Sequence, residues 1–166
     1  ALVGRGLVRV QDALRRRSME HDTTVSEQYS ALRILALADL DRAVTLAVRD
    51  PYVFRSRAYA LHHFGDHAGA LKDLDRVLKL GEGDLWTYDL RGKVRQALGD
   101  WAGSTGEFTM AIMISPWDAG VFARRGFGYL NSGRFAAAEQ DLSRSLALDS
   151  LDGRTWYLRA LARVIR

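Results

Sequence analysis

Apolar and small residues recur along most of this sequence at intervals of three and four positions, with polar residues between them. That spacing places the apolar side chains on one face of an α-helix. The periodic segments are short, and three of them are followed by a glycine that can close a helix in the left-handed conformation, at Gly65, Gly99 and Gly133. No segment shows a strand pattern. The sequence therefore predicts an all-α fold built from short helices joined by turns.

The pattern itself repeats with a fixed 34-residue period. Large aromatic side chains recur at Phe54, Tyr88, Phe122 and Trp156, and four positions later a small residue follows at Ala58, Gly92, Gly126 and Ala160. A second helical segment carries small residues at Ala36, Ala70, Ser104 and Ala138, and large apolar residues at Leu40, Leu74, Phe108 and Leu142. Each period thus predicts two helices, of which each has one buried face.

These positions resemble the tetratricopeptide repeat (TPR) family. Residues 85–118 match its motif most fully, with Pro116 at the end of the copy, although Ser104 replaces the usual alanine. Residues 51–84 and 119–152 are also complete copies, in which Glu82 and Ser150 replace the proline, and residues 153–166 supply a first helix. The resemblance implies a right-handed α-solenoid of stacked antiparallel helix pairs.

Residues 1–50 form a divergent helix pair in this interpretation. The stretch "ALADLDRAVTL" (36–46) is in register with "ALKDLDRVLKL" (70–80), so it belongs to a second helix. We expect that helix to be long, about 25–48, with Thr24 and Glu27 as a capping box. The segment "LVGRGLVRVQDAL", which is amphipathic, is its expected partner after a loop near 18–24.

An arginine precedes the small residue in each period, and an acidic residue repeats in the second helical segment. Each acidic residue could pair with an arginine of an earlier helix or with an arginine of a later helix. We predict an ion pair with the later arginine, which would link each repeat to the next. The alternative would leave Arg159 without an acidic partner. The predicted pairs are Asp39 with Arg57, Asp73 with Arg91, Glu107 with Arg125 and Asp141 with Arg159. Removal of one partner would strand a buried charge. The functional alternative is that the row of arginines binds phosphate groups. The acidic residues at matching positions argue against it, because they would compete with phosphate for the arginines.

In the TPR family, first helices line a concave surface, and the resemblance places particular positions of this sequence on it. The predicted partner-binding residues are Tyr52, Arg55, Tyr59, His62, Trp86, Asp89, Lys93, Phe127 and Asn131. Aromatic residues among them are typical of interface anchors, and Arg55 and Lys93 favour acidic groups. The alternative is that some rings pack between neighbouring first helices. The Lys–Asn clamp with which relatives hold chaperone C-termini is absent.

The sequence carries no enzyme motif, and we predict neither catalysis nor a cofactor. Without cysteine, disulfides and thiolate zinc sites are excluded. The stretch "HHFGDH" offers His62, His63 and His67 as candidate metal ligands. We predict no metal there, because His67 occupies the position of Trp101 and Phe135 in the other copies, where packing accounts for it.

Composition leaves several functions open. The net charge of +4 and a pI of about 9.7 allow nucleic-acid binding, but the basic excess is spread along the chain and forms no long stripe. No apolar run approaches the roughly 20 residues of a membrane helix, so no membrane insertion is expected. The favoured function is a noncatalytic scaffold that binds a peptide or protein segment in the groove. The alternatives are a bacterial secretion or envelope-assembly chaperone and the repeat region of a larger protein.

The last helix adds one further expectation. The stretch "WYLRALARVIR" carries apolar residues where a terminal repeat should be polar, which predicts self-association through that helix or additional chain after it. The compartment is not determined by the sequence, although the cytoplasm is favoured.

Overall fold

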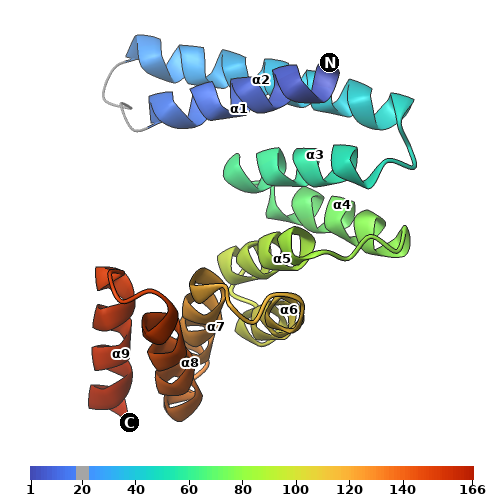
Figure 1. Ribbon diagram of the computed structural model, residues 1–166. Coiled ribbons are helices and arrows are strands. Elements are labelled where there is room, and N and C mark those ends of the chain that lie inside the picture. Colours follow the sequence, from blue (N-terminus) through green and yellow to red (C-terminus); the bar gives the residue numbers. More distant parts are fainter. Residues whose placement is uncertain (18–22) are drawn as a thin grey trace. The chain divides into compact units, whose positions relative to one another are not determined.

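Nine α-helices are present in the part of the chain that this computed structural model describes, residues 1–17 and 23–166 (Figure 1). Consecutive helices pack as antiparallel pairs, and the described residues contain no strand. The all-α prediction is confirmed. The helices are α1 (Leu2–Arg17), α2 (Thr23–Leu46), α3 (Pro51–His63), α4 (His67–Lys79), α5 (Leu85–Ala97), α6 (Trp101–Ile114), α7 (Ala119–Asn131), α8 (Phe135–Leu148) and α9 (Gly153–Ile165).

Aspartates precede most of these helices. Their carboxylates accept hydrogen bonds from backbone N–H groups of the first turn, which have no partner within the helix. The capping aspartates are Asp50, Asp66, Asp84, Asp100, Asp118 and Asp152. Helix α8 is different, because Arg134 occupies its N-cap and provides no side-chain hydrogen bond.

The turns inside three hairpins each contain a glycine in the left-handed region. Gly65, Gly99 and Gly133 have φ angles of 88°, 76° and 73°, which side chains with a Cβ rarely adopt. Each of these turns joins the two helices of one hairpin, as predicted from the repeat pattern.

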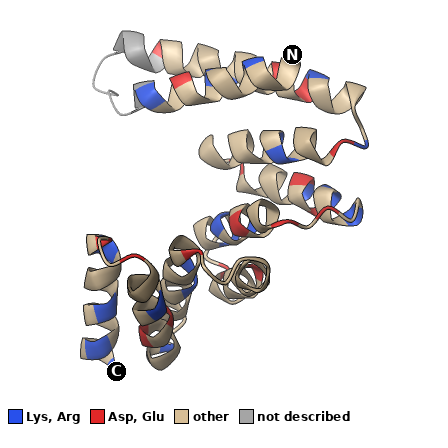
Figure 2. Ribbon diagram, in the orientation of Figure 1, with Lys and Arg blue, Asp and Glu red and all other residues tan. Residues whose placement is uncertain are grey.

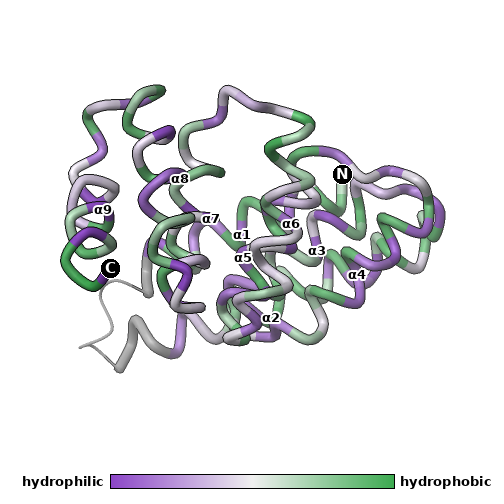
Figure 3. Tube along the Cα trace, turned by 90° about the horizontal axis from the view of Figure 1, so that it is seen from below, coloured by the Kyte–Doolittle hydropathy of each residue, from purple (hydrophilic) through white to green (hydrophobic). Residues whose placement is uncertain are grey.

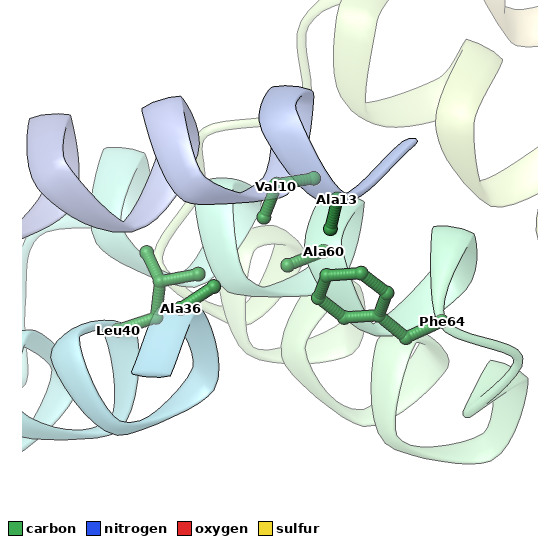
Figure 4. Close-up of a cluster of buried hydrophobic side chains, with 6 residues drawn as sticks. All are labelled: Val10, Ala13, Ala36, Leu40, Ala60 and Phe64. Carbon is green, nitrogen blue, oxygen red and sulfur yellow. The ribbon is translucent and has the colours of Figure 1, made fainter. Parts of the chain in front are cut away.

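The contacts divide the chain into two compact units, which we describe separately: unit 1 (Ala1–Glu82) contains α1–α4, and unit 2 (Gly83–Arg166) contains α5–α9. In unit 1, α1 packs along α2, and α3 contacts α1, α2 and α4. Val10, Ala13, Ala36, Leu40, Ala60 and Phe64 form its buried cluster (Figure 4). Helix α2 begins and ends two residues earlier than the predicted 25–48. Residues 18–22 of the predicted loop lie outside the described residues, and residues 23 and 24 belong to α2 instead. The side chain of Thr24, on which the capping box depends, is also outside them.

In unit 2, each helix packs on the next, and the first helices α5, α7 and α9 are neighbours. Phe108, Ala111 and Val121 form one buried cluster, and Ala138, Leu142, Leu158 and Ala162 form another. Hydrophobic and hydrophilic positions alternate along α7, α8 and α9 (Figure 3), as expected of helices that bury one face.

In three hairpins, a glycine of the first helix lies against a large side chain of the second helix. A Cβ atom built on Gly92 would be 2.5 Å from the ring of Phe108, and one on Gly126 would be 2.8 Å from Leu142. Gly6 in α1 stands in the same relation to Leu40 of α2, at 2.8 Å. These glycines therefore remove side-chain volume that the partner helix occupies.

The predicted pairing of each acid with the later arginine is wrong, because the ion pairs form with an earlier arginine, within each hairpin. Arg57 binds Asp73 through two hydrogen bonds of 2.7 and 2.6 Å, and Arg125 binds Asp141 through two of 2.6 and 2.8 Å. Arg91 donates to Glu107 at 2.7 Å, while Asp39 is held by Arg9 of α1 at 2.5 Å.

The reason lies in the direction of the arginine side chains, which point across their own hairpin rather than to the preceding one. Asp73, Glu107 and Asp141 are only 4%, 8% and 7% exposed, so each is buried beside its arginine. The bonds of Asp73 and Asp141 raise the pKa of Arg57 and of Arg125 above the ordinary arginine value.

Candidate functional site

A hollow of about 280 Å³ opens on unit 2 among the three first helices α5, α7 and α9. Such concave spaces with a few convergent polar groups are where proteins usually hold ligands. Its walls combine an aromatic ring, two guanidinium groups and small side chains: Gln96, Gly120, Ala123, Arg124, Phe127, Asp152, Arg154, Thr155 and Leu158.

Asp89 holds one wall of the hollow in place. Its side chain, only 14% exposed, lies 2.6 Å from Lys93 Nζ on α5 and 2.6 Å from Arg124 Nε on α7. Gln96 of α5 donates a hydrogen bond of 2.8 Å to the backbone oxygen of Arg124. Two predicted residues, Asp89 and Lys93, thus come together on α5. Asp89 and Gln96 hold Arg124 of the adjacent first helix α7.

Phe127 forms the apolar part of the hollow. Its ring meets Trp101 edge to face at 5.8 Å between centroids, and the guanidinium of Arg154 lies 5.6 Å from its centroid. The alternative of packing between helices therefore holds in part for Phe127, which is half-buried but still reaches the hollow.

Asp152 is the acidic residue of the hollow, and its carboxylate caps the N-terminus of α9. The hydroxyl of Thr155 and the backbone amides of Thr155 and Arg154 donate to its carboxylate and lower its pKa below the usual aspartate value. Asp152 is therefore ionised at neutral pH and committed to the helix N-terminus. The Arg154 guanidinium remains the outward-facing charge.

In unit 1, the predicted residues on α3 mostly contact other parts of that unit. The hydroxyl of Tyr59 accepts a hydrogen bond of 3.2 Å from Gln11 of α1, and its ring lies 4.3 Å from that of His63. His62 and His67 approach within 3.2 Å through their Nδ1 atoms. Tyr52, by contrast, is 52% exposed.

The remaining predicted residues lie apart from the hollow. Trp86 is 42% exposed near the start of α5, and Arg55 is half-buried on α3. Asn131 is exposed at the end of α7, where its side chain donates to the backbone oxygen of Phe127.

Sequence reasoning missed Arg124. Its neighbour Arg125 belongs to the repeating ion pairs, and Arg124 occupies a position that the family pattern does not assign to the concave face. A signal existed: Arg124 follows Asp89 by one repeat plus one position, which brings them to adjacent first helices.

The described residues were also searched for metal sites and membrane spans. No three His, Asp or Glu side chains among them are grouped so that they could hold a metal ion. Of the helices described, none is both long and apolar enough to cross a membrane.

The sequence matches no protein-family model, and no curated protein is significantly similar to it. Solved structures do match. MamA superimposes with a TM-score of 0.77 and 12% identity, over 86% of this chain and 84% of MamA. The TPR domain of Arabidopsis OM64 gives 0.66 and 18%, over 69% of this chain and 94% of that domain.

A third match contains a bound peptide. The second TPR domain of human RPAP3, solved in complex with an HSP70 peptide, gives a TM-score of 0.64 and 17% identity, over 69% of this chain and 98% of that domain. Together with the regular period and the antiparallel helix pairs, these matches show that the chain has the fold of tetratricopeptide repeat structures.

Proposed function

We propose that the chain is a noncatalytic module that binds a segment of another protein, and that unit 2 holds the segment at its hollow. The observation that supports this most is the combination of Phe127 with Arg124 and Arg154 around a space of about 280 Å³. An apolar side chain could rest against the ring while a neighbouring carboxylate meets a guanidinium group.

We expect the bound segment to carry an acidic residue near the apolar side chain that contacts Phe127. Arg124 is already partnered by Asp89, whereas the contact of Arg154 is with the face of Phe127, which leaves its N–H groups able to turn to a carboxylate. A TPR domain of similar fold, in RPAP3, was solved with a peptide whose sequence, SGPTIEEVD, is acidic at its end.

The predicted partner-binding residues now form two groups in this proposal. Phe127 lines the hollow, Asp89 and Lys93 support it, and Trp86 offers an exposed ring for the rest of a segment. Tyr52 is an exposed ring of unit 1. Tyr59 and His62 serve chiefly the packing of unit 1.

Nucleic-acid binding through the repeating arginines is disfavoured. Arg57, Arg91 and Arg125 each hold a buried carboxylate, and a phosphate would have to displace it. The secretion-chaperone and larger-protein alternatives stay predictions.

Selection of phage-displayed peptides on the intact chain tests the proposal. We expect the selected peptides to contain an acidic residue beside an apolar one. The Ala123→Arg substitution fills the hollow, and we expect it to weaken the binding of these peptides at least about tenfold (1.4 kcal/mol). Ala102→Arg is the matched control, because Ala102 is exposed on α6 and does not line the hollow. Failure to select any peptide, or equal binding to both variants, would contradict the proposal.

A further inference from the structure

Helix α6 presents an exposed apolar face on unit 2, and none of its residues lines the hollow. Glu107 is the one charged residue of α6 and is buried, so the helix shows no basic position in Figure 2. Met113, and Trp117 in the turn after the helix, are both 73% exposed. The α6 outer face is defined here as Ala102, Gly106, Met110, Met113, Ile114 and Trp117, all of which are exposed.

The same helix face points outward in the other hairpins, but there its side chains are basic, polar or small. The equivalents of Gly106, Met110 and Met113 are Lys72, Arg76 and Lys79 on α4, and Gln140, Arg144 and Ala147 on α8, all of them exposed. Helix α8 packs against both α7 and α9, yet these positions of α8 stay exposed. The exposure of the α6 outer face therefore does not result from a missing neighbour in the repeat, and its apolar character is particular to α6.

Gly106 is a second sign that something approaches this face from outside. Glycine inside a helix lowers helix stability by about 1 kcal/mol relative to alanine. A Cβ atom built on Gly106 would meet nothing within 4 Å, so packing among the described residues does not account for the glycine. Exposed apolar residues gathered on one face typically mark a protein–protein contact, and methionine adapts readily to an opposing surface.

The side chains of the α6 outer face increase in size along the helix. Ala102 and Gly106 are small, whereas Met113 and Trp117 at the other end are large and exposed. Two α6 helices related by a two-fold axis near Met110 would run antiparallel. Gly106 of each copy would then face Met113 of the other, and Ala102 would face the turn that contains Trp117. Large side chains would lie over small ones on both sides, as a two-fold interface requires.

Charge also favours the antiparallel orientation. The guanidinium of Arg144 on α8 lies 5.7 Å from the centroid of the Trp117 ring, beside the C-terminal end of α6. A parallel pair would bring the Arg144 side chains of two copies together. An antiparallel pair keeps them at opposite ends of the contact, and its centre contains no charge.

We propose that the α6 outer face is a two-fold interface between copies of this chain, in which α6 packs antiparallel on α6. A second copy is the occupant that the face fits best, because its own small-to-large order and its lack of charge complement themselves. A different protein is the poorer occupant, since the face presents no charge that would select it. The few side chains involved make the dimer weak and dependent on concentration.

Sedimentation equilibrium of the full chain over a concentration series tests the proposal. We expect a monomer–dimer equilibrium that the double substitution Met110→Arg and Met113→Lys weakens at least about tenfold. These are the residues that α4 carries at the same positions, so the fold tolerates them, and far-UV circular dichroism should stay unchanged. Val164→Lys is the matched control, because it places a charge on an exposed apolar residue of α9, and it should dimerise like the wild-type chain.

Disulfide cross-linking tests the orientation, because the chain has no cysteine of its own. Under mild oxidation, a mixture of the Gly106→Cys and Met113→Cys chains should form cross-linked dimers, and so should Met110→Cys alone. Met113→Cys alone should remain largely uncross-linked, since its two copies lie at opposite ends of an antiparallel contact.

A wild-type chain that stays monomeric at every concentration would overturn the proposal, as would a double variant that dimerises like the wild-type chain. Loss of the dimer in Val164→Lys would place the contact on α9, and efficient cross-linking of Met113→Cys alone would exclude the antiparallel pair. The hollow is tested separately. Ala102→Arg should lose the dimer and keep the selected peptides, whereas Ala123→Arg should lose the peptides and keep the dimer.

Discussion

At the scale of single residues, the repeating arginines act as internal partners of buried carboxylates. Asp141 is 7% exposed, and two hydrogen bonds from Arg125 offset its desolvation. The sequence could not give the direction of the pairing, because Asp141 lies at nearly equal separations from Arg125 before it and Arg159 after it. Only the path of the side chain across the hairpin distinguishes the two.

Replacement of one arginine tests this pairing. Arg125→Met leaves Asp141 buried and unpaired and should lower the free energy of unfolding by about 3 kcal/mol. Arg159→Met removes the repeat-equivalent arginine, which has a ring contact instead of an ion pair, and should cost less than about 1 kcal/mol. Urea denaturation measures both. A larger loss for Arg159→Met would favour the pairing of Asp141 with Arg159.

At the scale of helices, close packing decides where glycine is required. Gly92 lies in the middle of α5, where glycine lowers helix stability by about 1 kcal/mol relative to alanine. The ring of Phe108 occupies the space of the missing side chain. Gly106 in α6 is also helical, but a Cβ atom there would meet nothing within 4 Å. The two helical glycines thus have different roles, because Gly92 is buried and Gly106 is exposed.

Alanine substitutions separate these two roles. Gly92→Ala forces the helices of the hairpin apart, at a typical overpacking cost of about 1–3 kcal/mol, so it should be destabilising despite the better helix propensity. Gly106→Ala should raise the free energy of unfolding by up to about 1 kcal/mol. Thermal unfolding followed by circular dichroism measures both. If Gly92→Ala stabilised the protein as much as Gly106→Ala, the close approach would not be the reason for the glycine.

At the scale of the whole molecule, each unit is held together by contacts between helices that are close to one another in the sequence. Every packed pair of helices consists of immediate neighbours or of helices separated by a single one. Repeat proteins of this kind derive their stability from the helix pairs and the interfaces between neighbours. Folding therefore needs few distant segments to meet.

Refolding should accordingly be fast. Helical proteins with predominantly local contacts fold in microseconds to milliseconds, and we expect the main phase of this chain in that range. Stopped-flow tryptophan fluorescence after dilution from urea measures it, with far-UV circular dichroism as the control for helix recovery. A dominant phase lasting seconds in both signals would contradict the local-contact account.

The extent to which the sequence predicted the site differs between residues. The period placed Phe127, Asp89 and Lys93 on first helices, and the structure brings them to one face of unit 2. It did not identify Arg124, whose position depends on an ion pair with Asp89 of the adjacent first helix. Tyr59 has the same periodic position as Phe127, yet it contacts α1, because the divergent first pair supplies Gln11 beside it.

The sequence by itself determined the helical class, the regular period and the turns, because these depend on local conformation and on side-chain volume at fixed intervals. The tertiary structure alone decided which carboxylate each arginine binds, which rings stay exposed, and that α9 keeps an arginine without an acid. Those outcomes depend on which helix lies opposite a given side chain. A repeating sequence offers several equivalent candidates for that place, and only the packed arrangement selects one.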